Sequence, residues 1–196
     1  MSSIIDSAAD IRIYNYKTGT VHTEKGVVIY DTAVNVYKCF GNECEEAFDK
    51  LRYDKNIIQV IPISMGKICD FTVAQHFIKW MIGKYVNNVD GKRRIFKRSS
   101  KALIYLHEPM SSIDVKAYTD LMYMQGYKNI QVLSTDTTIA GMTPEEAIRN
   151  AEESLGKLDC AIEITKDKPL EYAHYAYETF KKDCKRWGVA PSDIID

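Results

Sequence analysis

The fold of this chain is decided by residues 57–85, whose sequence is IIQVIPISMGKICDFTVAQHFIKWMIGKY. A short apolar run ends at Pro62, and a tight link through Met65 and Gly66 follows it. Asp70 then opens a long amphipathic segment, where its carboxylate can accept hydrogen bonds from the free N–H groups of a first helical turn. This order predicts a strand, a tight link and a helix.

Apolar side chains recur at three- and four-residue spacing in the predicted helix. They are Val73, Phe77, Trp80, Met81 and Tyr85. That spacing places them on one helix face, and an apolar face of this width is typical of packing against a core. We therefore expect this stripe to be structural.

The composition sets bounds on the class of protein. A length of 196 residues fits one domain, or one domain with an extension, and 45 % apolar residues can form a real core. The net charge of −1 provides no overall attraction to nucleic acid or acidic lipid. We expect no membrane span, because no apolar run approaches the roughly 18 residues that one needs, and no signal peptide is recognisable. The five cysteines form no CxxC pair, so we expect reduced thiols in a cytoplasmic protein and no metal site.

The first 40 residues have the pattern of short strands separated by turns. Strands are predicted at residues 11–16, 20–23 and 27–30, with turns at Gly19 and Gly26. This spacing predicts an antiparallel three-strand ribbon. Residues 34–37 alternate in polarity and can extend it, and a helix is predicted at residues 43–51.

From residue 102 onwards strands and helices alternate. Strands are predicted at residues 102–107, 129–133 and 159–165. The helices between them begin at Ser111 and Thr143, each followed three residues later by an acid. Helical crossovers between strands imply parallel pairing, so we expect a mixed α/β sheet with flanking helices. A last helix is predicted at residues 168–188, with an apolar seam that would dock on the body of the domain.

This order of elements resembles domain I of the bacterial actin homologues, specifically the rod-shape-determining MreB group. The stretches that carry the resemblance are residues 10–13 (DIRI), 26–29 (GVVI), 62–73 (PISMGKICDFTV) and 102–133. Residues 62–73 are the most specific, because they resemble the family's Pro-Met-x-x-Gly-Val-Ile-Ala-Asp-x-x-Val. The resemblance covers about residues 8–140 and leaves 143–196 as a helix–strand–helix cap or extension. It implies a ribonuclease H-like, actin-like mixed sheet in a bacterial cytoskeletal protein.

The ATPase motifs of that family are missing from the matching positions. The family's Asp-x-Gly-Thr falls on residues 14–17, where Tyr14 and Tyr16 replace the metal-binding Asp and the Gly that lets the backbone approach a phosphate. The family's Glu-Glu-Pro falls on Ser134-Thr135-Asp136, with no carboxylate at the first position to orient water. The nearest candidate for the second phosphate loop, residues 163–168, contains no glycine, and 196 residues leave no room for domain II.

These departures lead us to expect a non-catalytic actin-like domain, a degenerate ATPase without catalytic residues, cofactor or metal. It would act as a protein-interaction or cytoskeleton-associated module, with a protein partner or with copies of itself. The alternative is a domain that binds a small molecule or nucleotide in a remodelled cleft without efficient hydrolysis. A third interpretation is a metal-dependent phosphohydrolase or nuclease, for which Asp10, Asp136 and Glu163 are the available carboxylates.

Two surface features remain open to more than one interpretation. A basic cluster consists of Lys92, Arg93, Arg94, Lys97, Arg98 and Lys101. It is either a solvated surface or a contact for a phosphate-bearing or acidic partner, with Phe96 able to stack on a base or enter a lipid headgroup layer. Four tyrosines of the predicted strands, Tyr14, Tyr16, Tyr30 and Tyr37, either pack between strands or form an exposed aromatic surface.

Overall fold

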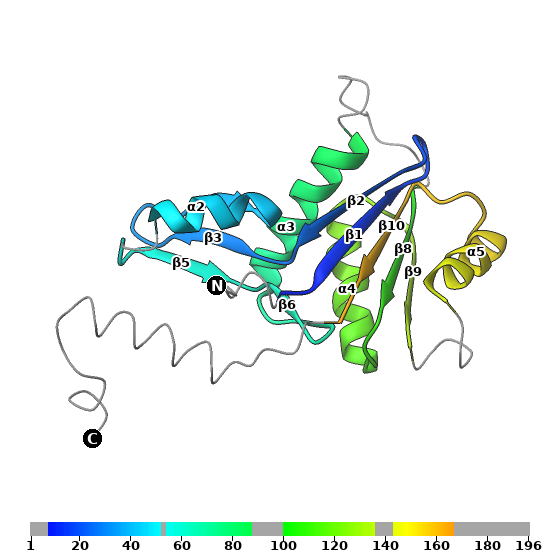
Figure 1. Ribbon diagram of the computed structural model, residues 1–196. Helices are drawn as coiled ribbons and strands as arrows, with labels where there is room; N and C mark the ends of the chain where they lie inside the picture. The colour runs from blue at the N-terminus through cyan, green and yellow to red at the C-terminus, as the bar shows by residue number, and fades with distance from the viewer. Residues whose placement is uncertain (1–7, 52–53, 88–99, 136–142, 167–196) are drawn as a thin grey trace.

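The largest sheet of the protein has five strands in the order β2-β1-β10-β8-β9 (Figure 1). The computed structural model describes residues 8–51, 54–87, 100–135 and 143–166. The strands are β1 (Asp10–Asn15), β2 (Thr20–Lys25), β8 (Lys101–Leu106), β9 (Asn129–Ser134) and β10 (Cys160–Ile164). β1 is antiparallel to both of its neighbours, whereas β10, β8 and β9 are parallel to one another. The predicted mixed sheet, with parallel pairing in the second half of the chain, is confirmed.

Helices cover both faces of this sheet. α3 (Phe71–Ile82) and α4 (Ser112–Met124) pack on one face, and α5 (Pro144–Leu155) packs on the other, at the right in Figure 1. The main core lies under α3 and α4, and its fully buried members include Ile11, Ile13, Phe77, Met81, Ile104, Leu106 and Leu121. A smaller core under α5 joins Ile148 and Ala151 to Leu103 and Ala161. The alternation of side chains along the strands thus supplies two different apolar faces.

The helices begin at the predicted caps. The Asp70 carboxylate accepts a hydrogen bond from the Val73 N–H at 2.9 Å. Ser111 with Asp114 forms a capping box at α4, and Thr143 with Glu146 forms another at α5. Each cap satisfies backbone N–H groups that have no partner within the helix, which is why these short polar residues mark helix starts in the sequence.

The membership of the antiparallel ribbon differs from the prediction. The predicted third strand, β3 (Val28–Asp31), does not pair with β2 but lies between β4 (Val36–Phe40) and β5 (Ile57–Val60) in a separate three-stranded sheet. Val28 and Ile29 are fully buried and belong to different cores: Val28 faces the main core, and Ile29 faces α2 (Cys44–Leu51). A strand buried on both faces needs cover on both, and this position provides it.

The stretch at residues 57–85 connects the two sheets. After β5, a hairpin of β6 (Ile63–Ser64) and β7 (Lys67–Ile68) leads into α3, which continues as η2 (Gly83–Asn87). The hairpin turns through Met65 and Gly66, both at positive φ. The predicted strand, link and helix are confirmed. Phe77 and Met81 of the apolar stripe are fully buried, while Trp80 is half-buried.

The strand predicted at residues 159–165 is present as β10, and its position is central. It lies between β1 and β8, and all five of its residues are buried. It is therefore part of the sheet rather than a cover laid over it. The helix predicted at residues 168–188 lies outside the described residues, so its docking stays a prediction, as does the division of the chain near residue 140. Within the described ranges, no helix combines the length and apolar character that crossing a membrane requires.

Candidate functional site

The hairpin between β1 and β2 holds the position where the family resemblance places a phosphate-binding turn. Asn15 is 1 % exposed, and its Oδ1 accepts hydrogen bonds from the N–H groups of Lys17 at 2.9 Å and Thr18 at 3.3 Å. Its backbone carbonyl accepts the Gly19 N–H at 2.8 Å. Its Nδ2 donates to the Tyr85 carbonyl at 2.8 Å, which ties the turn to η2. A phosphate cradle needs backbone N–H groups aimed at the ligand, whereas these three N–H groups are directed at Asn15.

The two tyrosines at this hairpin pack against the α5 side of the sheet. Tyr14 and Tyr16 join the core around Ile148 and Ala151. The Tyr14 hydroxyl donates a hydrogen bond to Glu163 Oε2 at 2.5 Å. Burial raises the pKa of both hydroxyls, to about 12 for Tyr14. The packing interpretation is confirmed for these two tyrosines.

Ser134, where the family resemblance places the first Glu of the water-orienting Glu-Glu-Pro segment, lies at the opposite edge of the sheet from the β1–β2 hairpin. Asn15 is level with Cys160 at the start of β10. Ser134, the last residue of β9, is level with Leu106 at the end of β8. The two positions are three strands and about four residues apart, which is roughly 14 Å across the sheet and 13 Å along it. The cause is β10, whose antiparallel pairing turns the end of β1 away from the carboxyl ends of β8 and β9.

A buried carboxylate on β10 is the centre of a polar cluster. Glu163 is 1 % exposed and accepts hydrogen bonds from Tyr14 and from Arg12 Nη1 at 3.4 Å. His107 Nε2 lies 2.7 Å from Glu163 Oε1. The guanidinium charge of Arg12 rests partly in solvent, because that side chain is 44 % exposed, and the attraction of Glu163 raises the pKa of Arg12. The carboxylate is thus ion-paired with Arg12 and hydrogen-bonded within the protein.

The acids proposed for metal catalysis do not assemble in the described part of the chain. The Asp10 carboxylate forms an ion pair with Lys25 at 2.5 Å, and Glu163 is held by the cluster around it. Asp136 lies outside the described residues. Among the described residues, no group of three His, Cys, Asp or Glu side chains is placed to hold a metal ion.

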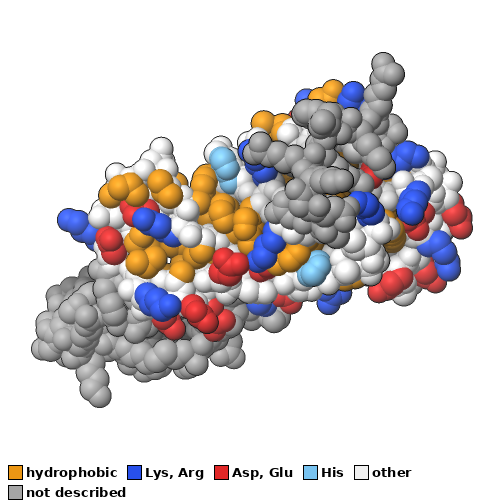
Figure 2. All heavy atoms as spheres, turned by 90° about the horizontal axis from the view of Figure 1, so that it is seen from above, with side chains coloured by type: hydrophobic (Ala, Val, Ile, Leu, Met, Phe, Trp, Pro, Cys, Tyr) orange, Lys and Arg blue, Asp and Glu red, His pale blue; other side chains and the backbone are white. Residues whose placement is uncertain are grey.

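An open groove of about 1080 Å³ lies between α3 and the smaller sheet. Its walls carry aromatic rings from both sides, and its lining residues include Tyr30, Val36, Tyr37, Phe40, His76, Lys79, Trp80 and Lys84. Phe40 stacks on Trp80 with ring centroids 5.4 Å apart, and Tyr37 contacts His76 at 4.7 Å. Figure 2 shows hydrophobic side chains gathered in a band on this face of the molecule, with basic side chains near its borders.

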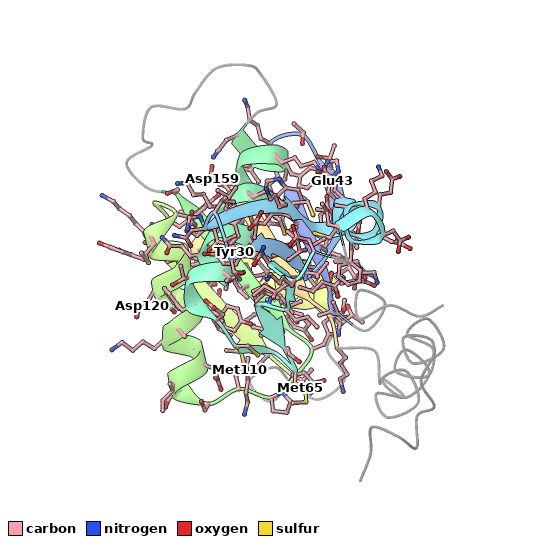
Figure 3. The ribbon with its side chains drawn as sticks, turned by 90° about the vertical axis from the view of Figure 1, so that its left-hand side faces the viewer. Tyr30, Glu43, Met65, Met110, Asp120 and Asp159 are labelled. Atoms are coloured by element: carbon pink, nitrogen blue, oxygen red, sulfur yellow. The ribbon has the colours of Figure 1, made fainter. Side chains whose placement is uncertain are left out.

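At one end of the groove, Lys84 is held by ion pairs. The Lys84 ammonium lies 4.6 Å from the centre of the Trp80 ring and forms ion pairs with Glu43 at 2.9 Å and with buried Glu24 at 3.3 Å. The Tyr85 hydroxyl also donates to Glu24. Tyr30 also lines the groove and contacts Tyr37 with ring centroids 5.1 Å apart, and both Tyr30 and Glu43 are labelled in Figure 3. We call this feature the aromatic groove.

The predicted basic cluster lies almost entirely outside the described residues. Lys101 is the exception, and its ammonium donates to the Leu155 carbonyl at the end of α5. That position stabilises the C-terminus of a helix, where backbone carbonyls lack partners. Anion or partner binding by the remaining residues stays a prediction.

Comparison with known proteins identifies the family. A family model described as MreB/Mbl protein matches residues 4–156. The chain belongs to the MreB/Mbl family. The match reaches past residue 140 and includes α5. A search of curated proteins found no match.

Two solved structures are similar to this MreB/Mbl-family chain. MreB5 of Spiroplasma citri bound to AMPPNP has a TM-score of 0.53 and 18 % sequence identity, and the alignment covers 66 % of this chain and 36 % of that one. MreB5 of the same organism bound to ADP has a TM-score of 0.50 at 18 % identity, covering 65 % and 35 %. At this identity the likeness concerns the fold, which is the actin-like, ribonuclease H-like one that the resemblance implied. The chain spans about a third of the length of these proteins.

Two features escaped prediction from sequence. The aromatic groove depends on β3 and β4 forming a separate sheet that faces α3. In the sequence it was indicated only by Tyr30, Tyr37 and Trp80. The Glu163 cluster depends on β10 entering the sheet beside β1. Both arise from contacts between distant segments.

Proposed function

We propose that this MreB/Mbl-family chain is an actin-like domain that does not hydrolyse ATP and acts through protein contacts. One observation carries the proposal. The segments that would hold the phosphates and orient the attacking water lie at opposite edges of the five-stranded sheet. Phosphoryl transfer depends on positioning these groups around one phosphate, and a separation of roughly 20 Å prevents that.

The local chemistry at each edge supports the same conclusion. The turn N–H groups of residues 17–19 bind Asn15, and the Tyr14 side chain binds Glu163 where the family would place a metal-binding acid. At the other edge Ser134 is 1 % exposed and carries no carboxylate. A hydrolytic site would need changes at both edges together with a new strand order.

The aromatic groove is the surface that we propose for the protein contact. Its occupant would be a protein segment with an aromatic or aliphatic anchor next to acidic residues. The half-buried rings of Tyr37, Phe40 and Trp80 provide an apolar floor, and exposed Lys79 provides positive charge on the α3 side. Rings that are already held by stacking lose little conformational entropy when an anchor packs on them, which favours such surfaces at interfaces. Association with copies of the same chain, a role in the cytoskeleton or in rod shape, and a cytoplasmic location are parts of the same proposal.

The alternative, a nucleotide bound in a remodelled cleft, is favoured by one observation. A stacked aromatic pair with Lys84 above one ring has the chemistry that recognises a base and an anion. It is the weaker candidate because Lys84 is already paired with two carboxylates.

Thermal unfolding with ATP, GTP and Mg²⁺ tests the first part. We expect no rise in Tm with nucleotide over that with MgCl₂ alone, and no phosphate release above a blank. A ligand at 100 times its Kd stabilises the native state by about 2.7 kcal/mol. A Tm that rises with nucleotide concentration would therefore contradict the proposal.

Fluorescence anisotropy with designed peptides tests the groove. The probe is a labelled peptide of Asp and Glu around a central Trp, and its partner is the same peptide with Lys in place of the acids. We expect the acidic peptide to bind and Lys79→Glu to weaken it, whereas Lys116→Glu on the exposed face of α4 leaves binding unchanged. Equal binding of both peptides, or of both variants, would show that the groove does not select an acidic partner. Light scattering at rising protein concentration measures self-association in the same samples.

A further inference from the structure

Two cysteines meet beneath the smaller sheet. Cys39 lies near the end of β4, and Cys44 is the first residue of α2. The intervening turn, η1 (Gly41–Glu43), brings their Sγ atoms to 3.1 Å, where they share a hydrogen bond. Gly41 makes the turn possible with a φ of +66°. The two sulfurs lie in the core under α2, together with Ile29 and Ile57.

The geometry allows a bond between the two sulfurs with little movement. A disulfide has an S–S length of about 2.05 Å, so each sulfur has to move by about half an ångström. Rotation of the two side chains about their Cα–Cβ bonds provides such a shift without displacing the backbone elements. The short connection through η1 keeps the partners together, so the encounter needs no large opening of the fold.

The two thiols differ in environment, which assigns them different roles. Cys39 is 9 % exposed and Cys44 is fully buried. The neighbouring Cys44 thiol lowers the pKa of Cys39, because a hydrogen bond stabilises the thiolate. The pKa of Cys44 is raised, first by its hydrogen bond with Cys39 and second by burial. Cys39 is therefore the nucleophile that a small oxidant reaches first, and Cys44 is the thiol that resolves the product.

We propose that Cys39 and Cys44 are a redox modification site that forms a reversible disulfide with hydrogen peroxide. The Cys39 thiolate attacks one peroxide oxygen, an S–O bond forms, the O–O bond breaks, and the departing hydroxide takes up a proton to become water. The Cys44 sulfur then attacks the Cys39 sulfur, the S–O bond breaks, and the hydroxyl leaves with the Cys44 proton as a second water. Two thiols are oxidised and one peroxide is reduced. An external thiol restores the reduced pair by exchange.

The other described cysteines provide internal controls. Cys69 is exposed, and its Sγ hydrogen-bonds the Lys67 carbonyl at 3.7 Å. Cys160 is fully buried, and burial raises its pKa to about 12. Neither has the paired geometry of Cys39 and Cys44. The site is independent of the proposed function, although Phe40, which follows Cys39 directly, lines the aromatic groove.

Mass spectrometry on the full chain tests the proposal. The reduced protein is treated with hydrogen peroxide, denatured, alkylated and digested with trypsin, which releases residues 39–50 as one peptide holding both cysteines. We expect this peptide to lose two hydrogens and both alkylation sites, and to regain both sites after dithiothreitol. Alkylation of both cysteines under conditions that oxidise Cys69 would overturn the proposal. Equal rates of disulfide formation in the folded chain and in urea would overturn it as well, because the native geometry would then contribute nothing.

Dimedone, which traps sulfenic acids, tests the two roles. In Cys44→Ser we expect dimedone on residue 39 after peroxide treatment. In Cys39→Ser we expect no dimedone on residue 44 after the same treatment. Stronger labelling of residue 44 than of residue 39 would contradict the assignment. Since a variant can fail to fold, the wild-type peptide measurement decides the existence of the site independently.

Discussion

Glu163→Gln is the substitution that tests the polar cluster on β10 most directly. The change keeps the size of the side chain and removes its charge. The wild-type carboxylate accepts two short hydrogen bonds, from Tyr14 at 2.5 Å and with His107 at 2.7 Å, and it pairs with Arg12 at 3.4 Å. A neutral amide also presents an NH₂ group to neighbours that donate, so at least one bond has to reorganise.

The expected cost follows from these contacts. Hydrogen bonds to a charged group contribute about 1.5–3 kcal/mol and neutral ones about 0.5–1.5 kcal/mol, so each short bond loses about 1 kcal/mol. The Arg12 side chain is 44 % exposed, so its ion pair adds no more than the roughly 0.2–1 kcal/mol of a surface pair. We expect a loss of about 2–3 kcal/mol in the free energy of unfolding, or roughly 4–12 °C in Tm for a chain of this size.

Urea denaturation followed by circular dichroism measures this free energy, with Tm from thermal scans as a second readout. The matched control is Glu153→Gln on the exposed face of α5, for which we expect a change within about 0.5 kcal/mol. If Glu163→Gln were as stable as the control, or more stable than the wild type, the desolvation cost of the carboxylate would equal or exceed its hydrogen-bond gain. That result would refute our account of the cluster.

Three further predictions concern the hairpin and the η1 turn. Tyr14→Phe is expected to lower the free energy of unfolding in urea by about 1.5–3 kcal/mol. Tyr16→Phe is expected to be neutral or stabilising, because the buried Tyr16 hydroxyl has no hydrogen-bond partner among the described residues. Equal losses in the two variants would contradict a stabilising role for the Tyr14 hydrogen bond. The pKa of Tyr14 is raised to about 12 by burial and by Glu163, so the contribution of its hydroxyl to stability is complete below pH 10 and is lost as the pH rises toward 12. We expect the difference in free energy of unfolding between wild type and Tyr14→Phe to shrink over that range. A constant difference would show that the hydroxyl does not titrate as described. Gly41→Ala is expected to lower the Tm more than Gly19→Ala. Both positions have positive φ, but only at Gly41 would a Cβ lie 2.9 Å from Glu24 Cδ. Similar losses in Tm would mean that the Glu24 side chain moves aside at little cost.

Local signals in the sequence predicted most of the elements. The caps at Asp70, Ser111 and Thr143 act through hydrogen bonds within one helical turn, so their meaning does not depend on the rest of the fold. The stripe with Phe77 and Met81 likewise follows from helix geometry, and both side chains are in the core. The family resemblance of residues 62–73 rests on the same stretch and agrees with the family match.

Strand partners could not be predicted with the same success. The pattern of β3 is compatible with pairing to β2, yet it pairs with β4 and β5, because two cores compete for its two apolar faces. The place of β10 beside β1 depends on pairing across about 150 residues of sequence. The candidate site followed from these choices: the aromatic groove exists because β3 and β4 face α3, and the Glu163 cluster exists because β10 lies between Arg12 and His107.

The sequence by itself determined the type and approximate position of most of the described helices and strands, the family, and the absence of the ATPase motif residues from the matching positions, because each depends on residue identity and short-range spacing. Only the tertiary structure decided that the hairpin after β1 and the end of β9 lie at opposite edges of one sheet, and that residues 57–85 join two sheets around an aromatic groove. The physical reason is that backbone pairing between strands is almost independent of residue identity, so the order of strands is selected by which arrangement buries all apolar faces at once.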